Sequence, residues 1–187
     1  MNRFTDLSTY NNDWYKKEIG ASKLKQVCWY FLNVLFFINP LNPSSWLKRI
    51  LLKMFGAKIG KGVIFKPAIN IKYPWKLTIG DNSWIGEKVW IDNLGIVSIG
   101  KNVCLSQGAM LLTGNHNFAK TNFELMVDGI ILEDGVWIGA QALVCPGVNC
   151  ATHAVLTARS VATRNLDAFT IYQGNPAVAV KQRAIIE

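Results

Sequence analysis

The sequence is poor in histidine and has no paired cysteines. Only two of its 187 residues are histidines, His116 and His153, too few for a catalytic zinc site held by three imidazoles. The four cysteines form no CxxC pair, and they are Cys28, Cys104, Cys145 and Cys150. We therefore expect ordinary buried or half-buried thiols in a reducing cytoplasm, without a metal or disulfide role.

Long apolar runs are also scarce. The start of the chain has no apolar run after its first charges, so we expect no signal peptide. Residues 23–38 have the spacing of a helix, and residues 27–38 are apolar except for Asn33. Twelve helical residues span about 18 Å, well short of the roughly 30 Å hydrocarbon layer, so this segment is not predicted to cross a membrane. It either packs against the rest of the protein or a neighbouring subunit, or lies in a membrane interface.

Acidic residues are rare in the first third of the chain. Residues 1–66 hold 11 Lys and Arg but 3 Asp and Glu, whereas residues 67–187 hold nine of each, so the whole net charge of +8 lies at the front. A basic front suits an anionic membrane surface, a phosphorylated sugar carrier or an acidic polymer. A nucleic-acid partner is not predicted, because no helix-turn-helix, aromatic platform or zinc module accompanies the charge.

A second helix is expected over residues 46–55, between the breakers Asn42-Pro43 and Gly56. Ser45 is placed to cap it. One face is predicted to be apolar and the other basic. The apolar face would hold Trp46, Leu47, Ile50, Leu51 and Met54, and the basic face Lys48, Arg49 and Lys53.

A six-residue period dominates the rest of the chain. Ile59, Ile79 and Ile99 each precede a glycine and are 20 residues apart, and Leu132 to Cys150 is 18 residues, or three hexads. Such a period indicates a parallel β-helix, in which each hexad forms one side of a prism and stacked coils bury a continuous core. The period is lost from Asn117 to Gly129. A loop extruded from so regular a scaffold is typical of a functional segment.

Several segments resemble the hexapeptide-repeat acyltransferases, whose fold is a left-handed parallel β-helix. They are the repeats, Thr113-Gly-Asn-His116, Val136-Trp-Ile-Gly139 and Gln173-Gly-Asn-Pro-Ala177. Residues 6–15, 55–60 and 71–75 resemble the colanic-acid acetyltransferase branch. The resemblance implies a mainly β chain with an N-terminal arm and helices at 1–56, with Trp14 and Tyr15 as anchors. A β-helix domain follows at 57–177, with an extruded loop at 113–129 and a terminal helix at 178–187.

His116 is the candidate general base. An alcohol is a poor nucleophile until its proton is being removed, and imidazole has the unperturbed pKa nearest working pH. His116 lies in the non-repeating loop between Asn115 and Asn117, whereas His153 holds an outward position of its hexad and is expected on the surface. The group that orients His116 stays open: a backbone carbonyl, or one of the carboxylates Asp6, Asp13, Asp92 and Glu124.

The resemblance also implies the substrates and their contacts. Acetyl-coenzyme A is the implied acyl donor, without a required metal. Its implied contacts are Trp137, Gly139, Ala140, Ala158 and Thr163 along the slot, with Arg164, Lys181 and Arg183 as phosphate partners. Val178 departs from the family, which usually has arginine there. The implied acceptor contacts are Asp92, Asn93 and Asn115, although Asn93 also suits an ordinary turn. The family's trimer implies that adjacent subunits complete each active site.

We therefore predict a cytoplasmic O-acetyltransferase that modifies a sugar hydroxyl of a capsular or exopolysaccharide intermediate, with possible peripheral membrane contact through residues 1–56. Two alternatives stay open. The acceptor could be a free sugar or an amino-sugar nucleotide, or the chain could be a non-catalytic, membrane-associated assembly protein.

Overall fold

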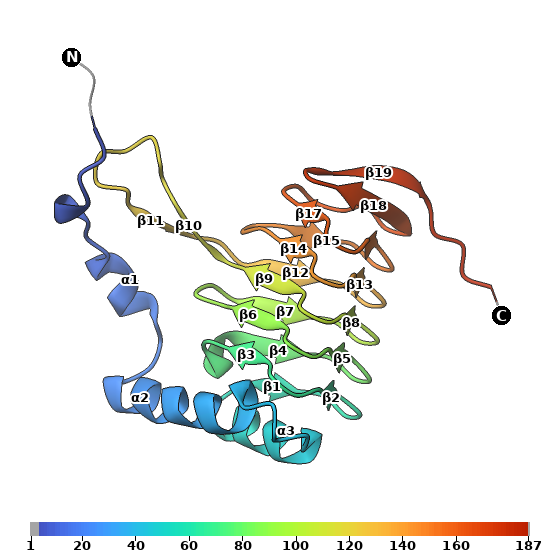
Figure 1. The fold of residues 1–187 in the computed structure, drawn as a ribbon, viewed down its shortest axis with the longest axis horizontal. Coiled ribbons are helices and arrows are strands. Elements are labelled where there is room, and N and C mark those ends of the chain that lie inside the picture. Colours follow the sequence, from blue (N-terminus) through green and yellow to red (C-terminus); the bar gives the residue numbers. More distant parts are fainter. Residues whose placement is uncertain (1–3, 187) are drawn as a thin grey trace.

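The chain forms a three-sided prism of parallel strands, with helices at one end and a hairpin projecting from one side (Figure 1). The structure is a computed structural model that describes residues 4–186. Residues 1–3, where part of the signal-peptide prediction falls, and residue 187 lie outside the described part. Successive coils visit the three faces in turn and add one strand to each sheet, which confirms the predicted β-helix.

Three sheets make the faces of the prism. The first holds β1 (Lys58–Ile59), β4 (Leu77–Ile79), β7 (Val97–Ile99), β12 (Ile130–Leu132) and β15 (Asn149–Cys150). The second holds β2 (Ile64–Phe65), β5 (Trp84–Ile85), β8 (Cys104–Leu105), β13 (Trp137–Ile138), β16 (Val155–Leu156), β18 (Thr170–Gly174) and β19 (Ala177–Gln182). The third holds β3 (Asn70–Ile71), β6 (Trp90–Asp92), β9 (Met110–Leu112), β14 (Leu143–Val144) and β17 (Val161–Ala162).

The six-residue repeat sets the register of the coils. Ile79 is paired with Ile59 on one side and with Ile99 on the other, so identical side chains stack along the axis. These inward residues are buried and form one continuous apolar core with the equivalent residues of the other two faces. Because a shift by one residue would turn every side chain to the other surface, the repeat fixes the register of the whole prism.

The helices cover the N-terminal end of the prism (Figure 1). After the short helices η1 (Leu7–Thr9) and α1 (Asp13–Glu18), the chain forms α2 (Lys23–Leu32), which continues as the π-helix η2 (Asn33–Ile38). One side of this pair is buried through Trp29, Asn33 and Phe37. The Asn33 amide donates to Asn70 Oδ1 at 2.7 Å, so the one polar residue of the apolar run docks on β3. The other side is exposed, and no described helix is long and apolar enough to cross a membrane.

The second helix, α3 (Ser45–Met54), differs from its prediction in two ways. Ser44 is the cap, because its hydroxyl accepts the backbone N–H of Leu47, while the Ser45 hydroxyl accepts the N–H of Phe65 in β2. The predicted faces are also wrong: Lys48 is fully buried, whereas Trp46 and Met54 are exposed. The Lys48 ammonium donates to the carbonyl of Asn42, and burial lowers its pKa. This helix therefore packs through Lys48 and Leu52.

Two terminal predictions also change. The expected terminal helix is wrong, because Ala177–Gln182 forms β19 and pairs antiparallel with β18. The segment begins by alternating alanine and valine, which suits a strand, and the free edge of β18 offers unpaired backbone groups that a helix would leave unused. In the arm, Tyr15 is buried and is an anchor as expected, whereas Trp14 is about half exposed.

A matched pair of isoleucines tests the core. Ile85 is fully buried in β5, whereas Ile131 in β12 is 50% exposed. Ile85→Ala should lower the free energy of unfolding by about 2–5 kcal/mol, because the deletion leaves a cavity between stacked coils. Ile131→Ala should cost less than about 1 kcal/mol. Equilibrium denaturation of both variants measures this, and equal losses would contradict the assigned register.

Candidate functional site

The non-repeating loop is an antiparallel hairpin of β10 (Gly114–His116) and β11 (Leu125–Val127). Its root is fixed by Thr113, which is fully buried. The Thr113 hydroxyl donates to the carbonyl of Asp92 at 2.8 Å and accepts the N–H of Gly95 at 2.9 Å. The hairpin is therefore hydrogen-bonded to the corner turn of the preceding coil, which gives His116 a defined position outside the prism.

His116 is held by Phe123, in the turn of its own hairpin. Its Nδ1 lies 2.9 Å from the carbonyl oxygen of Phe123, and the two rings stack in parallel at 4.4 Å. Because a carbonyl can only accept, this bond requires a proton on Nδ1. In the neutral ring Nε2 is then the unprotonated nitrogen and can accept a proton from a ligand. Phe123 has a φ of +47°, a left-handed conformation that is uncommon for a bulky residue.

Each carboxylate considered as an orienter of His116 contacts another group in the described chain. Asp6 accepts from Ser8, and Asp13 pairs with Lys16 at 2.7 Å. Glu124 pairs with Lys120 at 2.7 Å, and Asp92 with Lys72 at 3.0 Å. Hydrogen bonds lower the pKa of the Asp6, Asp13 and Glu124 carboxyls. The contact that the structure gives the ring is thus the backbone carbonyl, one of the alternatives that the sequence left open.

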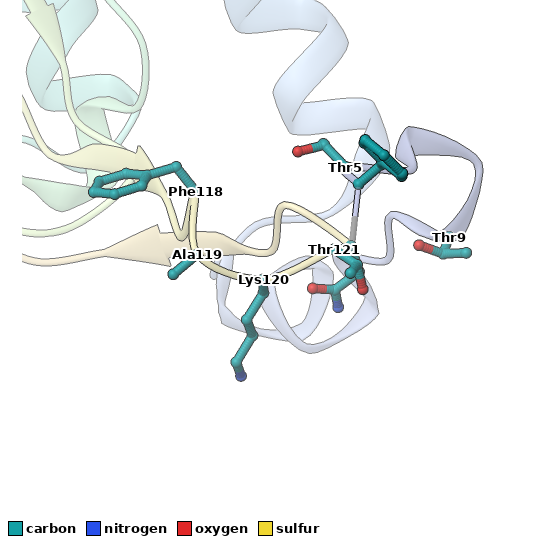
Figure 2. A pocket seen from close by; sticks show the side chains of 8 residues that line it. Thr5, Thr9, Phe118, Ala119, Lys120 and Thr121 are labelled. Atoms are coloured by element: carbon teal, nitrogen blue, oxygen red, sulfur yellow. The ribbon is translucent and has the colours of Figure 1, made fainter. Parts of the chain in front are cut away.

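The N-terminal arm lies against the hairpin. The Asp6 N–H donates to the carbonyl of Thr121 at 2.7 Å, and the Tyr10 ring centre is 5.8 Å from that of His116. Figure 2 shows the cavity between the arm and the hairpin tip. It has a volume of about 580 Å³ and is lined by Phe4, Thr5, Thr9 and residues 118–122. The arm therefore packs against the hairpin beside His116, in addition to its anchor at Tyr15, whose hydroxyl donates to the carbonyl of Leu94.

The three acceptor candidates are not equally accessible. Asn115 is exposed and its Oδ1 accepts the N–H of His116 at 2.8 Å. Asn93 is fully buried, and its amide bonds both the N–H and the carbonyl of Tyr73, as a structural turn residue would. An acceptor could reach the Asn93 amide only if Tyr73 were released.

Asp92 opens onto a different space. It lines a cavity of about 350 Å³ between α2 and the third face of the prism, together with Lys72, Tyr73, Trp90 and Tyr30. Burial and the nearby Asp92 carboxylate raise the pKa of the Tyr73 phenol. No motif marks Lys72 and Tyr73 as functional candidates in the sequence, although both belong to the 71–75 segment that carries the resemblance. This polar cluster lies one coil from the hairpin root, because Asp92 pairs with Leu112.

The donor candidates lie on another side of the prism. Trp137 is 46% exposed on β13, and its indole N–H donates to Ser106 Oγ at 2.9 Å. Gly139 and Ala158 follow β13 and β16 at one corner, so they stack on each other. A Cβ on Gly139 would lie 2.5 Å from the Ala158 nitrogen, so this close approach requires glycine. Ala140 belongs to the same corner, where its carbonyl accepts the N–H of Arg159.

The three cationic candidates differ in what they contact. Arg164 is exposed beside Thr163 at the end of β17, and Lys181 is exposed on β19. The Arg183 guanidinium instead donates to the carbonyls of Gly135 at 2.9 Å and His153 at 3.1 Å. His153 lies outside the core, half buried, with its ring stacked on Phe169 at 4.7 Å. Arg183 therefore joins the C-terminal strand to a coil corner.

A single chain does not bring the base and the donor candidates together. The hairpin leaves the prism on one side, whereas β8 and β13 lie on the opposite side in Figure 1. Among the described residues, no cluster of three or more His, Cys, Asp or Glu side chains is arranged to hold a metal ion. If His116 and Trp137 serve one reaction, they must come from two copies of the chain.

Known proteins resemble this chain over most of its length, although no family profile matches it. It is 36% identical over 169 residues to the protein named "Putative colanic acid biosynthesis acetyltransferase WcaF" of Escherichia coli (strain K12), covering 90% of this chain and 92% of that one. It is 26% identical to the galactoside O-acetyltransferase of the same organism, covering 80% and 75%. The crystal structure of a hexapeptide-repeat-containing acetyltransferase of Vibrio cholerae O1 biovar eltor, complexed with acetyl coenzyme A, superposes with a TM-score of 0.79 at 20% identity, covering 96% of each chain.

The tautomer of His116 is a direct test of the hairpin geometry. Under alkaline conditions, where imidazoles are neutral, the proton should reside on Nδ1, because the Phe123 carbonyl accepts it. Long-range ¹H–¹⁵N correlation spectra distinguish the two ring nitrogens. The variant His153→Asn removes the only other imidazole and so assigns the signal. A proton on Nε2 of His116 would contradict the proposed role of the carbonyl.

Proposed function

The chain belongs to the hexapeptide-repeat acetyltransferases, and from this membership we propose that it transfers acetyl from acetyl-coenzyme A to a sugar hydroxyl of a capsular or exopolysaccharide intermediate. The observation that carries the proposal is the hydrogen bonding of His116. Its Nδ1 bonds to the carbonyl of Phe123, and its Nε2 has no hydrogen-bond partner among residues 4–186. The 36% identity to the colanic acid relative supports the class of acceptor. We also propose a reducing cytoplasm as its location, because Cys28, Cys104, Cys145 and Cys150 are free thiols.

His116 acts as the general base in this proposal. Nε2 takes the proton of the sugar hydroxyl as its oxygen attacks the thioester carbonyl, and the carbon–sulfur bond breaks to leave the thiol of coenzyme A. The proton passes from the imidazole to the departing sulfur. The Phe123 carbonyl stabilises the imidazolium that exists between these transfers, because the Nδ1–H bond becomes charge-assisted. Asn115 is the proposed acceptor contact beside the base. Asp92 is the proposed contact in the separate cavity under α2, where Asn93 holds the Tyr73 turn.

Acetyl-coenzyme A supplies the acyl group when bound, and the corner that follows β13 suits its extended arm. Gly139, Ala140 and Ala158 present small side chains there, and Trp137 forms a wall beside them. Thr163 and Arg164 follow β17 and are both exposed, on the far side of the third face from this corner. Arg164 and Lys181 are the proposed phosphate partners, because Arg183 is engaged by backbone carbonyls and Val178 replaces the family's arginine.

A homotrimer joins these parts. Each prism wall alone offers a shallow surface, and the hairpin lies on the side opposite β13. We propose that the hairpin of one protomer faces the donor corner of its neighbour, as the family resemblance implies. A ring of three protomers repeats this heterologous contact and closes on itself.

A free sugar is the competing acceptor, and the identity to a galactoside O-acetyltransferase favours it. Thiol release from acetyl-coenzyme A, assayed with monosaccharides, galactosides and polysaccharide repeat units, separates the two acceptors. Turnover on monosaccharides alone would replace the polymer intermediate by a small acceptor without changing the role of His116.

Replacement of the base tests the proposal. His116→Ala should reduce turnover by about 10²-fold or more while coenzyme A still binds, because general-base catalysis contributes on this order. His153→Ala is the matched control, since it removes the other imidazole, and it should keep near-normal turnover. Initial rates of thiol release and calorimetry with coenzyme A give both readouts. Normal turnover of His116→Ala would reject the role of the imidazole.

Mixed trimers test whether two protomers share a site. His116→Ala lacks the base, and Ala158→Trp should block the donor corner, so each variant alone should retain at most about a hundredth of the activity. Random trimers from equal amounts should recover about a quarter of the sites, because each site needs the base of one chain and the corner of the next. Activity is measured after denaturing and refolding the mixture. No recovery from trimers shown to be mixed would place both parts of the site on one protomer.

A further inference from the structure

The outward side of α2 and η2 carries a stripe of exposed apolar side chains. Its members recur mostly every three or four residues, as on one face of a helix, and they are Leu24, Val27, Phe31, Val34 and Leu35. Leu24 is 73% and Phe31 58% exposed. Burying this stripe away from water would be favourable. Its members form a continuous row, whereas the exposed apolar residues of most soluble proteins are scattered singly.

Apolar exposure continues on the neighbouring elements at the same end of the prism. Leu41 follows η2 and is 86% exposed, and Trp46 and Met54 are exposed at the two ends of α3. Figure 1 shows α2 and α3 together at the end where the prism begins, away from the hairpin and from β18 and β19. We name the exposed side of α2, η2 and α3 the base surface.

The charge around the base surface has one sign. Residues 19–80 contain no Asp or Glu, whereas they contain the cations Lys23, Lys25, Lys48, Arg49, Lys53, Lys58, Lys61, Lys66, Lys72 and Lys76. A recess of about 340 Å³ on α3 and the first coil is lined by Trp46, Arg49, Lys53 and Lys61. None of these three cations is ion-paired within residues 4–186. The nearest acid along the chain is Asp81, which accepts the backbone N–H of Lys61.

We propose that the base surface docks on an anionic lipid bilayer. The apolar stripe and Trp46 enter the interface between head groups and acyl chains, and Arg49, Lys53 and Lys61 bind head-group phosphates. This combination of an apolar face and clustered cations is what recognises an anionic membrane. A second copy of the chain fits less well, because two base surfaces would bring like charges together.

The proposed trimer would strengthen membrane binding. Only this gain in strength depends on the trimer; the docking of a single base surface does not. Prisms arranged side by side in a closed ring, with parallel axes, point their N-terminal ends in the same direction. Three base surfaces then face one plane and bind the same membrane. Linked weak contacts of this kind give an avidity well above that of one contact.

Vesicle sedimentation of the full chain tests the proposal. Vesicles of phosphatidylcholine with about a third phosphatidylglycerol should bind at least about tenfold more protein than vesicles of phosphatidylcholine alone, since each basic residue near an anionic surface strengthens binding severalfold. Raising the salt concentration should weaken the binding. The double variants Phe31→Glu/Leu35→Glu and Lys53→Glu/Lys61→Glu should each reduce binding to the anionic vesicles about tenfold or more.

Two controls match these variants in chemistry and lie elsewhere. Ile186→Glu changes an exposed apolar residue near the C-terminus, and Lys101→Glu reverses an exposed cation outside residues 19–80. Both should bind as the unaltered chain does.

Thiol release with a water-soluble acceptor should persist in all four variants, which separates a failure of lipid binding from a failure of the proposed reaction. Unaltered vesicle binding in both base-surface variants, or no binding by the unaltered chain, would overturn the proposal. A smaller assembly of Phe31→Glu/Leu35→Glu in light scattering, without loss of lipid binding, would assign the stripe to contacts between copies.

Discussion

The strict register of stacked coils is the constraint on which the rest of the structure depends. Ile59, Ile79 and Ile99 can occupy one column only if every coil returns to the same position after three sides. Any residues beyond the repeat must then leave the prism at a corner, since the interior has no space for them. The Asn93 turn and the β10–β11 hairpin both leave in this way, and the buried Thr113 hydroxyl joins them across adjacent coils. The scaffold therefore determines where the candidate chemistry can be placed.

The hairpin fixes both the orientation and the tautomer of the His116 ring. Phe123 contributes its carbonyl to Nδ1 and its ring to the face of His116, and both contacts come from one residue with left-handed backbone. Such strain persists only where surrounding structure determines it. Here the ladder between β10 and β11 does so, because it pairs His116 with Leu125 and thereby fixes the turn that contains Phe123. A carboxylate is not needed to choose the tautomer.

The sequence predicted those features that the six-residue period controls. It predicted the coils, the loop where the period is lost, and the positions of His116 in that loop and His153 outside the core. These follow from the repeat because inward positions admit only apolar or small side chains. It failed where tertiary contacts compete with local pattern. The pattern predicts Lys48 on the basic face of its helix, yet the side chain is fully buried and its ammonium donates to the carbonyl of Asn42. The sequence predicts a helix over residues 178–187, yet Ala177–Gln182 pairs with the open edge of β18 as a strand. The partner of His116 could not be chosen from sequence, since a backbone carbonyl has no residue signature.

The prism also fixes the height of the site above the base surface. The hairpin leaves the third coil, and coils repeat every 4.8 Å or so, which places its root about 10 Å above the first coil. The helices add a layer of about 10 Å below that coil. A docked molecule would thus hold the root of the hairpin roughly 20 Å from the lipid head groups, and the hairpin rises still farther from the base surface in Figure 1. A sugar attached directly to a lipid would lie too low, whereas one several units along a membrane-linked chain would reach the hairpin. The same axial repeat that orders the core would then select acceptors by length.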